Sequence, residues 1–162
     1  MKEYGSRLHR ILEILSWIIL GLSFLVAVYG MFTLPDVIAT HYNVRGEVDD
    51  YGSPATLFMT PVGMGICLLI VSLCMHFVNP RNWNTVTEVR RRNRKAVYRD
   101  LLTMMVLTEL EVSVFTFYLQ ILFYLETVKG LWIGMLIFCG LIALTVILLS
   151  VKMYKDNKKG YV

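Results

Sequence analysis

Residues 14–34 read ILSWIILGLSFLVAVYGMFTL and contain no charged side chain. A helix rises about 1.5 Å per residue and the hydrocarbon core of a bilayer is about 30 Å thick, so this stretch is long enough to span a membrane once. Three further apolar stretches follow, at about residues 55–78, 101–125 and 131–151. Because no water satisfies peptide groups inside lipid, each of the four stretches is predicted to be a helix.

The composition of the whole chain agrees with a membrane protein. Of the 162 residues, 56% are hydrophobic and only 17% are charged, and the mean hydropathy is +0.58. A soluble domain carries about 25% charged residues, and a globule of this size has too much surface to bury the apolar excess. These values exclude a disordered chain, a disulfide scaffold and an ordinary cytosolic enzyme. We predict an all-α membrane protein, a single domain over residues 1–162 with four transmembrane helices.

The first apolar stretch has an alternative interpretation as a secretory signal peptide, because Lys2, Arg7 and Arg10 precede it. However, its apolar run is longer than the usual core of a signal peptide, and no cleavage site of the A-x-A type follows it. We therefore expect residues 14–34 to be a retained span.

Charges outside the apolar stretches predict the orientation of the chain. The net charge is +1 over residues 1–13, −3 over 35–54, +5 over 79–100, zero over 126–130 and +3 from Lys152 onward. Lys and Arg gather in cytoplasmic loops of membrane proteins. We therefore expect both chain ends and the basic loop 79–100 in the cytoplasm, and a structured loop 35–54 outside it.

Local signals predict where helices begin and end. Ser53-Pro54 is typical of a helix start, and Asn79-Pro80 is typical of a helix end. Residues 85–88, Thr-Val-Thr-Glu, match a capping box, which predicts a cytoplasmic helix that lies on the membrane surface or continues into the third span.

The basic loop carries a run of cations that could contact nucleic acid, anionic lipid or another protein. The run comprises Arg90, Arg91, Arg92, Arg94 and Lys95. It lacks the interleaved aromatic residues of a platform for nucleic-acid bases, and topology and attraction to anionic lipid already account for it. We predict contact with the lipid bilayer or with a cytoplasmic regulator, and no nucleic-acid partner.

The outward loop holds the first group of candidate site residues. Pro35 and Asp36 are expected to begin a helix, and Gly46 and Gly52 to supply turns. The side chains that could bind a metal or an external partner are His41, Asn43, Glu47, Asp49 and Asp50. Neither the calcium-loop pattern nor H-E-x-x-H occurs. We favour a packed cap that contacts a partner, with no metal or cofactor, and a divalent-cation site is the alternative.

The second group lies inside a predicted span. Glu109 and Glu111 are close to the membrane centre, where a charge costs about 2.5–3.5 kcal/mol on insertion scales. They lie about 200° apart around a helix and cannot share a face. Glu111 lines up with Thr108 and Tyr118.

Glu109 heads a polar stripe at helical spacing, with Ser113, Thr116 and Gln120, and we expect this stripe to face the bundle interior. One interpretation is a proton or cation relay. The other is hydrogen bonding between helices, which the limited room among four helices favours. No G-x-S-x-G, P-loop or dinucleotide motif occurs, so we predict no enzyme.

The outward loop resembles the signature of a bacterial membrane family. Its string LPDVIATHYNVRGEVDDYGS, Leu34 to Ser53, is similar to the loop between the first two spans of SdpI-type immunity proteins, whose N-terminal part is an uncharacterised domain. The matching residues are Leu34, Pro35, His41, Tyr42, Asn43, Gly46, Glu47, Asp49, Tyr51, Gly52 and Ser53. The resemblance covers roughly residues 10–80, and the later half of an SdpI-type protein is not evident here.

This resemblance implies a non-enzymatic, multi-pass protein of the bacterial plasma (inner) membrane, with a role in toxin immunity or signal relay. SdpI-type proteins protect their producer from a secreted peptide toxin and can sequester a transcriptional repressor at the membrane. We therefore expect the outward loop to recognise an external ligand or toxin, and oligomers are compatible with the small residues of the spans. The alternative function is a small transporter, or a transporter subunit, that uses Glu109.

Overall fold

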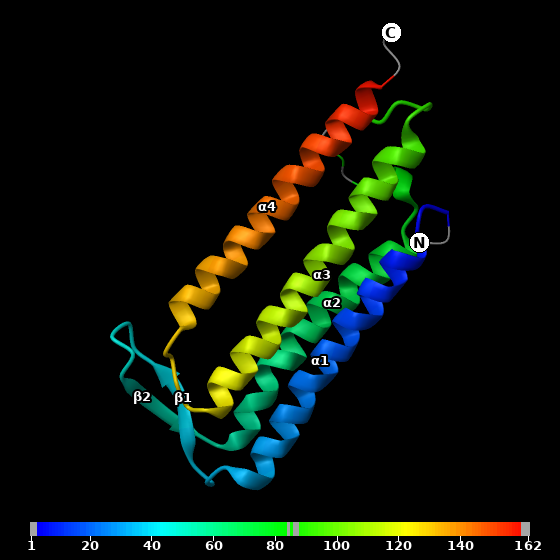
Figure 1. Cartoon of the computed structure of the whole chain (residues 1–162). Helices are drawn as coiled ribbons and strands as arrows, with labels where there is room; N and C mark the ends of the chain where they lie inside the picture. Colours follow the sequence, from blue (N-terminus) through cyan, green and yellow to red (C-terminus); the bar gives the residue numbers. More distant parts are fainter. Residues whose placement is uncertain (1–2, 84, 86–87, 160–162) are drawn as a thin grey trace.

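The computed structural model describes residues 3–83, 85 and 88–159. Four long helices dominate it: α1 (Arg7–Thr33), α2 (Met59–Phe77), α3 (Arg94–Tyr124) and α4 (Leu131–Lys158). Each is long and apolar enough to cross a membrane, α2 together with the short 3-10 helix η1 (Pro54–Phe58) that precedes it. Figure 1 shows the helices side by side, with a β-hairpin at one end and the start of α1 and the end of α4 at the other. The prediction of four such helices is confirmed.

Most predicted helix boundaries agree with the structure. Ser53 caps η1 and Pro54 is its first residue, and α2 ends at Phe77, just before Asn79-Pro80. The capping box expected at residues 85–88 includes positions outside the described residues. The helix that follows begins only at Arg94 and continues without a break into the third apolar stretch. A second 3-10 helix, η2, spans Pro80–Asn82.

The connection between α1 and α2 is a β-hairpin, so the chain is mostly rather than entirely helical, and the helix start expected at Pro35-Asp36 is wrong. Strand β1 (Ile38–Tyr42) pairs antiparallel with β2 (Val48–Gly52), with an irregular register around His41. Apolar and polar residues alternate only weakly along the two strands, and Ile38 is the one buried residue of the pair. At the turn, Gly46 adopts φ +80°, a left-handed conformation that glycine reaches without steric cost.

Helices α1 and α3 pack against each other along nearly their whole length and run in the same direction (Figure 1). Buried residues on both helices recur every three or four positions, the spacing of left-handed helix pairs. On α1 they are His9, Glu13, Ser16, Leu20, Ser23, Ala27 and Gly30, and on α3 they include Leu102, Val106, Glu109, Ser113, Thr116 and Gln120. Small residues on α1 allow the two backbones to approach closely.

Helix α4 is peripheral. It packs on α3, and no residue of its most apolar 18-residue window is buried inside the protein. Such an apolar surface suits contact with lipid chains rather than water. The protein interior therefore lies among α1, α2 and α3. Another face of α3 packs against α4.

Candidate functional site

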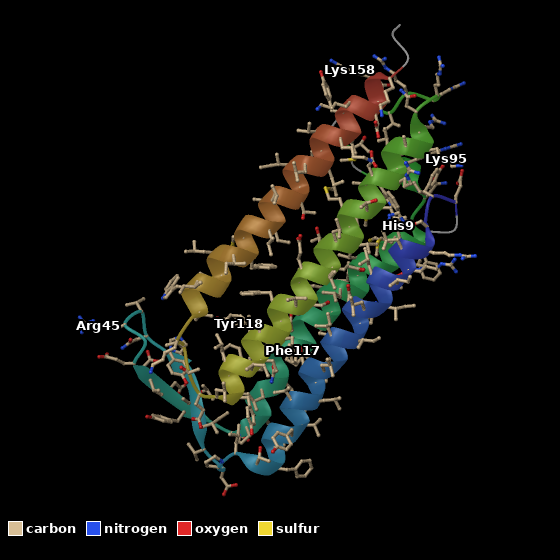
Figure 2. All side chains as sticks on the ribbon, in the orientation of Figure 1. His9, Arg45, Lys95, Phe117, Tyr118 and Lys158 are labelled. Atoms are coloured by element: carbon tan, nitrogen blue, oxygen red, sulfur yellow. The ribbon has the colours of Figure 1, made fainter. Side chains whose placement is uncertain are left out.

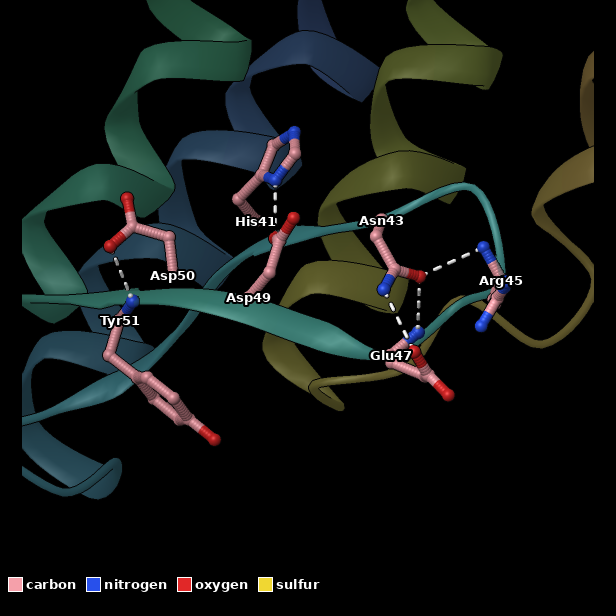
Figure 3. A network of polar contacts seen from close by, with 7 residues as sticks. All are labelled: His41, Asn43, Arg45, Glu47, Asp49, Asp50 and Tyr51. Atoms are coloured by element: carbon pink, nitrogen blue, oxygen red, sulfur yellow. Dashed lines mark hydrogen bonds and ion pairs between the residues drawn. The ribbon is translucent and has the colours of Figure 1, made fainter.

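Two of the predicted loop residues hold the hairpin turn. The Asn43 side-chain oxygen accepts hydrogen bonds from the N–H groups of Arg45 (2.8 Å) and Glu47 (3.1 Å), and its Nδ2 donates to Glu47 Oε2 (2.9 Å), as Figure 3 shows. Asn side chains commonly bond to backbone a few residues on and so stabilise turns. Asn43 and Glu47 are therefore engaged in shaping the hairpin, and the resemblance motif is in part a folding signal.

The other three predicted loop residues are on the strands. His41 Nδ1 lies 2.5 Å from Asp49 Oδ1, while Asp50 Oδ1 accepts a hydrogen bond from the Tyr51 N–H at 2.9 Å (Figure 3). No group of three or more His, Cys, Asp and Glu side chains in the described part of the chain is placed to hold a metal ion. The five candidates therefore form a turn and one His–Asp pair rather than a single ligand cluster.

The hairpin is anchored to the end of the helix bundle. Ile38 is only 1% exposed and packs with Ala27 of α1 and Leu57 of η1. The Ala39 N–H donates to Glu126 Oε2 at 2.9 Å, which joins β1 to the turn between α3 and α4. Sequence reasoning missed Glu126, because nothing in a short neutral turn indicates which strand it meets. The Tyr42 hydroxyl is buried, and this burial raises the pKa of Tyr42.

A groove of about 470 Å³ lies between the hairpin, the start of α2 and the end of α3. Its apolar residues come from the hairpin, from η1 and α2, and from α3, and its polar residues come from β1, β2, η1 and α2. The lining comprises Ile38, Ala39, Thr40, His41, Asp50, Thr56, Leu57, Met59, Thr60 and Phe123. The structure thus brings His41 and Asp50 into one groove, and leaves Asn43, Glu47 and Asp49 out of its lining.

Glu109 faces the bundle interior, as its spacing predicts, and is 2% exposed. No group of the described residues bonds to either of its carboxyl oxygens, and the amide of the fully buried Gln120 is likewise unpartnered there. Ser113 and Thr116 donate instead to backbone oxygens one turn earlier on α3, both at 2.8 Å. The polar stripe is therefore inside the bundle, but its side chains do not form a continuous hydrogen-bond chain.

A cavity of about 310 Å³ adjoins Glu109, with walls from α2, α3 and one residue of α4. Its lining is otherwise mostly apolar and includes Cys67, Val71, Met105 and Thr108. A buried carboxyl group beside an empty apolar space is costly unless it has a bonding partner. This arrangement makes Glu109 the most unusual interior group of the spans.

Glu111 is on another face of α3 and has a partner. Thr145 of α4 donates to Glu111 Oε1 at 2.5 Å, so this oxygen joins the two helices, whereas Glu111 Oε2 is buried without a partner among the described residues. An apolar groove of about 470 Å³ between α3 and α4 borders Glu111 and Tyr118, and the Tyr118 hydroxyl donates to the Gly130 carbonyl at 2.8 Å. The spacing on α3 predicted a separate face for Glu111 but could not identify its partner helix.

Polar contacts near the far end of the bundle were not predicted. Glu13 accepts from the Ser72 hydroxyl at 2.8 Å and lies 3.5 Å from His76 Nδ1. His9 Nε2 and Thr103 Oγ1 are 2.9 Å apart. Glu13 was not singled out from the sequence, because it was assigned to the N-terminal segment 1–13, whose net charge is positive. The signal that places it in the interior is its four-residue and three-residue spacing from His9 and Ser16 on α1.

The basic run is divided by the fold. Arg90, Arg91 and Arg94 line a pocket between the loop and the end of α4, while Arg92 and Lys95 do not line it. Figure 2 shows Lys95 and Lys158 at this end of the bundle and Arg45 at the hairpin end.

The four helices together define a multi-pass membrane-type protein. Within this class, one family model matches the chain: Domain of unknown function (DUF1648), over residues 18–65. The match covers most of α1, the whole hairpin and the start of α2, which is less than a third of the chain. No curated protein and no solved structure matches.

Proposed function

We propose that the protein is a multi-pass protein of the bacterial plasma membrane, with the hairpin outside the cell and both chain ends in the cytoplasm. The hairpin-side loop carries a net charge of −3 and the opposite loop +5, and cytoplasmic loops carry the excess of Lys and Arg. The start of α1 and the end of α4 lie on the +5 side of the bundle (Figure 1), and the sequence is net positive over residues 1–13 and from Lys152 onward.

On this orientation, the groove under the hairpin recognises a secreted, largely apolar peptide and serves in immunity or signalling rather than catalysis. The observation that carries the proposal is the groove itself, which combines an apolar floor from Ile38, Leu57 and Phe123 with the rim residues His41 and Asp50. Apolar concave surfaces with a few placed polar groups are typical ligand sites. The carboxylate of Asp50 suits a Lys, an Arg or the amino terminus of the peptide.

The resemblance of the loop to SdpI-type immunity proteins supports the same function. A peptide held at the outer surface would be kept from the lipid, and the basic cytoplasmic loop would contact lipid or a regulator. The hairpin is suited to binding because Ile38 and Glu126 fix it to the bundle, so little ordering is required when a ligand arrives.

The test is a toxin challenge of a strain that lacks the gene, complemented with matched variants. Asp50→Lys and Met59→Glu alter the groove, whereas Asp36→Lys and Val37→Glu make the same changes at exposed positions outside its lining. Removing one charged or well-packed contact costs about 2 kcal/mol or more at a binding hot spot, which is roughly thirtyfold in affinity. We expect the groove variants to lose protection and the control variants to keep it, with equal protein levels in the membrane.

Two results would count against this function. One is unchanged toxin sensitivity of the deletion strain across a panel of secreted peptide toxins. The other is full protection by both groove variants, because a groove that binds an apolar, cationic toxin should tolerate neither a reversed charge at Asp50 nor a new carboxylate at Met59.

Glu109 supports a second candidate function, a small transporter or transporter subunit. The supporting observation is a buried carboxyl group that has no partner among the described residues and lies beside a cavity between α2 and α3, an arrangement that often marks an ion or proton pathway. Glu109→Gln should abolish a pH-dependent flux into proteoliposomes, and Glu111→Gln should leave it. A flux that survives Glu109→Gln, or no flux in the wild type, would exclude the transporter.

A further inference from the structure

The pocket at the end of the bundle opposite the hairpin has a strongly basic lining. It has a volume of about 650 Å³ and combines four cations with a single acid. The lining comprises Glu88, Val89, Arg90, Arg91, Arg94, Tyr154, Asn157 and Lys158. Positive charge on a cytoplasmic loop is expected from topology alone, but topology does not require that cations from a loop and from α4 line one concave space.

Specific hydrogen bonds build this pocket. The Asn157 side chain accepts from the Arg90 N–H at 3.0 Å and donates to the Glu88 carbonyl at 2.8 Å. Asn93 Nδ2 donates to the carbonyls of Asn157 (2.8 Å) and Lys159 (3.0 Å). These bonds fix residues 88–93 against the last turn of α4, so the pocket walls are positioned before a ligand binds.

Acids nearby do not neutralise the pocket. Asp100 and Asp156, two buried acids close to the end of α4, pair with Lys152 and Lys159 instead. Among the described residues, Arg91, Arg94 and Lys158 take part in no salt bridge. Arg94 Nε is buried and has no hydrogen-bond acceptor there.

A guanidinium donor without an acceptor among the described residues, in a net-positive pocket, suits an anion with several acceptor oxygens. We propose that this pocket binds a phosphate group. Arg presents planar pairs of N–H donors that match phosphate oxygens, and Lys adds a compact charge. Lys158, whose ammonium lies 4.3 Å from the centre of the Tyr154 ring, brings a cation from α4 to face the arginines of the loop.

The N-terminus of α3 and the C-terminus of α4 lie next to each other at this pocket, so the partial charges of the two helix ends offset each other. The charged side chains therefore determine the sign of the electrostatic potential in the pocket. Two sources could supply the phosphate: the headgroup of an anionic phospholipid, or a soluble phosphate compound. The surface beside the pocket favours the lipid, because Val151 and Tyr154 expose apolar surface on α4 where acyl chains would lie.

A matched pair of double variants tests the site. Arg91→Gln/Lys158→Gln removes two cations from the pocket, and Arg92→Gln/Lys155→Gln removes one from the same loop and one from the same end of α4. All four side chains are exposed, so the fold should survive, and equal helix content by circular dichroism checks this. The readout is the amount of phosphatidylglycerol, against phosphatidylcholine, retained by the purified full chain in native mass spectrometry.

The wild type and the control pair should retain phosphatidylglycerol in preference to phosphatidylcholine. The pocket pair should lose about tenfold or more of that retention, since a charge-assisted hydrogen bond to a phosphate oxygen contributes about tenfold or more in affinity and the control pair lines no part of the pocket. Displacement of the lipid from wild type by millimolar inorganic phosphate would assign the site to soluble phosphates, and no displacement would assign it to lipid. Equal losses in the two double variants, or no preference for phosphatidylglycerol together with no binding of inorganic phosphate, would overturn the proposal.

Discussion

Ser23→Leu should lower the free energy of unfolding by about 1–3 kcal/mol, the usual cost of overpacking a filled interior. Ser23 is 0% exposed on the face of α1 that packs against α3. Its hydroxyl donates to the Ile19 carbonyl of the same helix at 3.3 Å, so the loss of that bond leaves no partner on another helix unsatisfied. The change in the free energy of unfolding therefore reflects how closely α1 and α3 pack at this position. It is measured by unfolding in mixed micelles, followed by circular dichroism.

Gly21→Leu is the matched control on the same helix. Gly21 is exposed on the lipid side, and a Cβ added there meets no atom within 4 Å. A leucine at this position adds helix propensity and lipid contact, so stability should stay the same or rise. If the two substitutions had equal effects, α1 and α3 would not be in close contact along the Ser16–Ser23–Gly30 face.

Glu109→Leu should raise the free energy of unfolding by about 1–3 kcal/mol, because it removes a buried polar group to which no described residue bonds. The branched apolar side chain also has the adjoining cavity of about 310 Å³ in which to pack. Few single substitutions stabilise a protein this much, so the sign of the change is as informative as its size. The same unfolding assay applies.

Glu111→Leu provides the comparison, since it changes the same residue type two positions along the same helix. It removes the acceptor of the Thr145 hydroxyl and should lower stability by about 0.6 kcal/mol, the average for a hydrogen bond between membrane helices. Opposite signs for the two leucine substitutions are the expected pattern. A destabilising Glu109→Leu would mean that the carboxyl group has a bonding partner in the membrane, as an ion or proton pathway requires.

Much of the helical architecture could be predicted from the sequence, because length and hydropathy alone determine which segments can cross a bilayer. The position of Ser53-Pro54 at the start of the second helical segment followed from local chemistry in the same way. The hairpin was not predicted. Its strands are only five residues each and its alternation is weak, and Pro35-Asp36 resembles a helix start when tertiary contacts are unknown.

Contacts between helices account for most of what the sequence could not predict at the candidate sites. Spacing along α3 places Glu109 and Glu111 on different faces, but only the packing of α3 against α4 gives Glu111 its partner Thr145. The basic run looks uniform along the chain, yet the bonds of Asn93 and Asn157 select Arg91 for the pocket and leave Arg92 outside it.

The proposed function requires that the hairpin lies outside the cell and the basic pocket inside. Single cysteines test this directly in a chain whose three native cysteines, Cys67, Cys74 and Cys139, are replaced by alanine. Val44→Cys lies at the hairpin turn, where the side chain is 92% exposed, and Arg92→Cys lies in the exposed part of the basic loop.

A membrane-impermeant maleimide is added to intact cells and again after permeabilisation. We expect Val44→Cys to be labelled in intact cells and Arg92→Cys to be labelled only after permeabilisation. Labelling of Arg92→Cys but not Val44→Cys in intact cells would contradict the orientation, and with it the recognition of an external peptide by the hairpin groove.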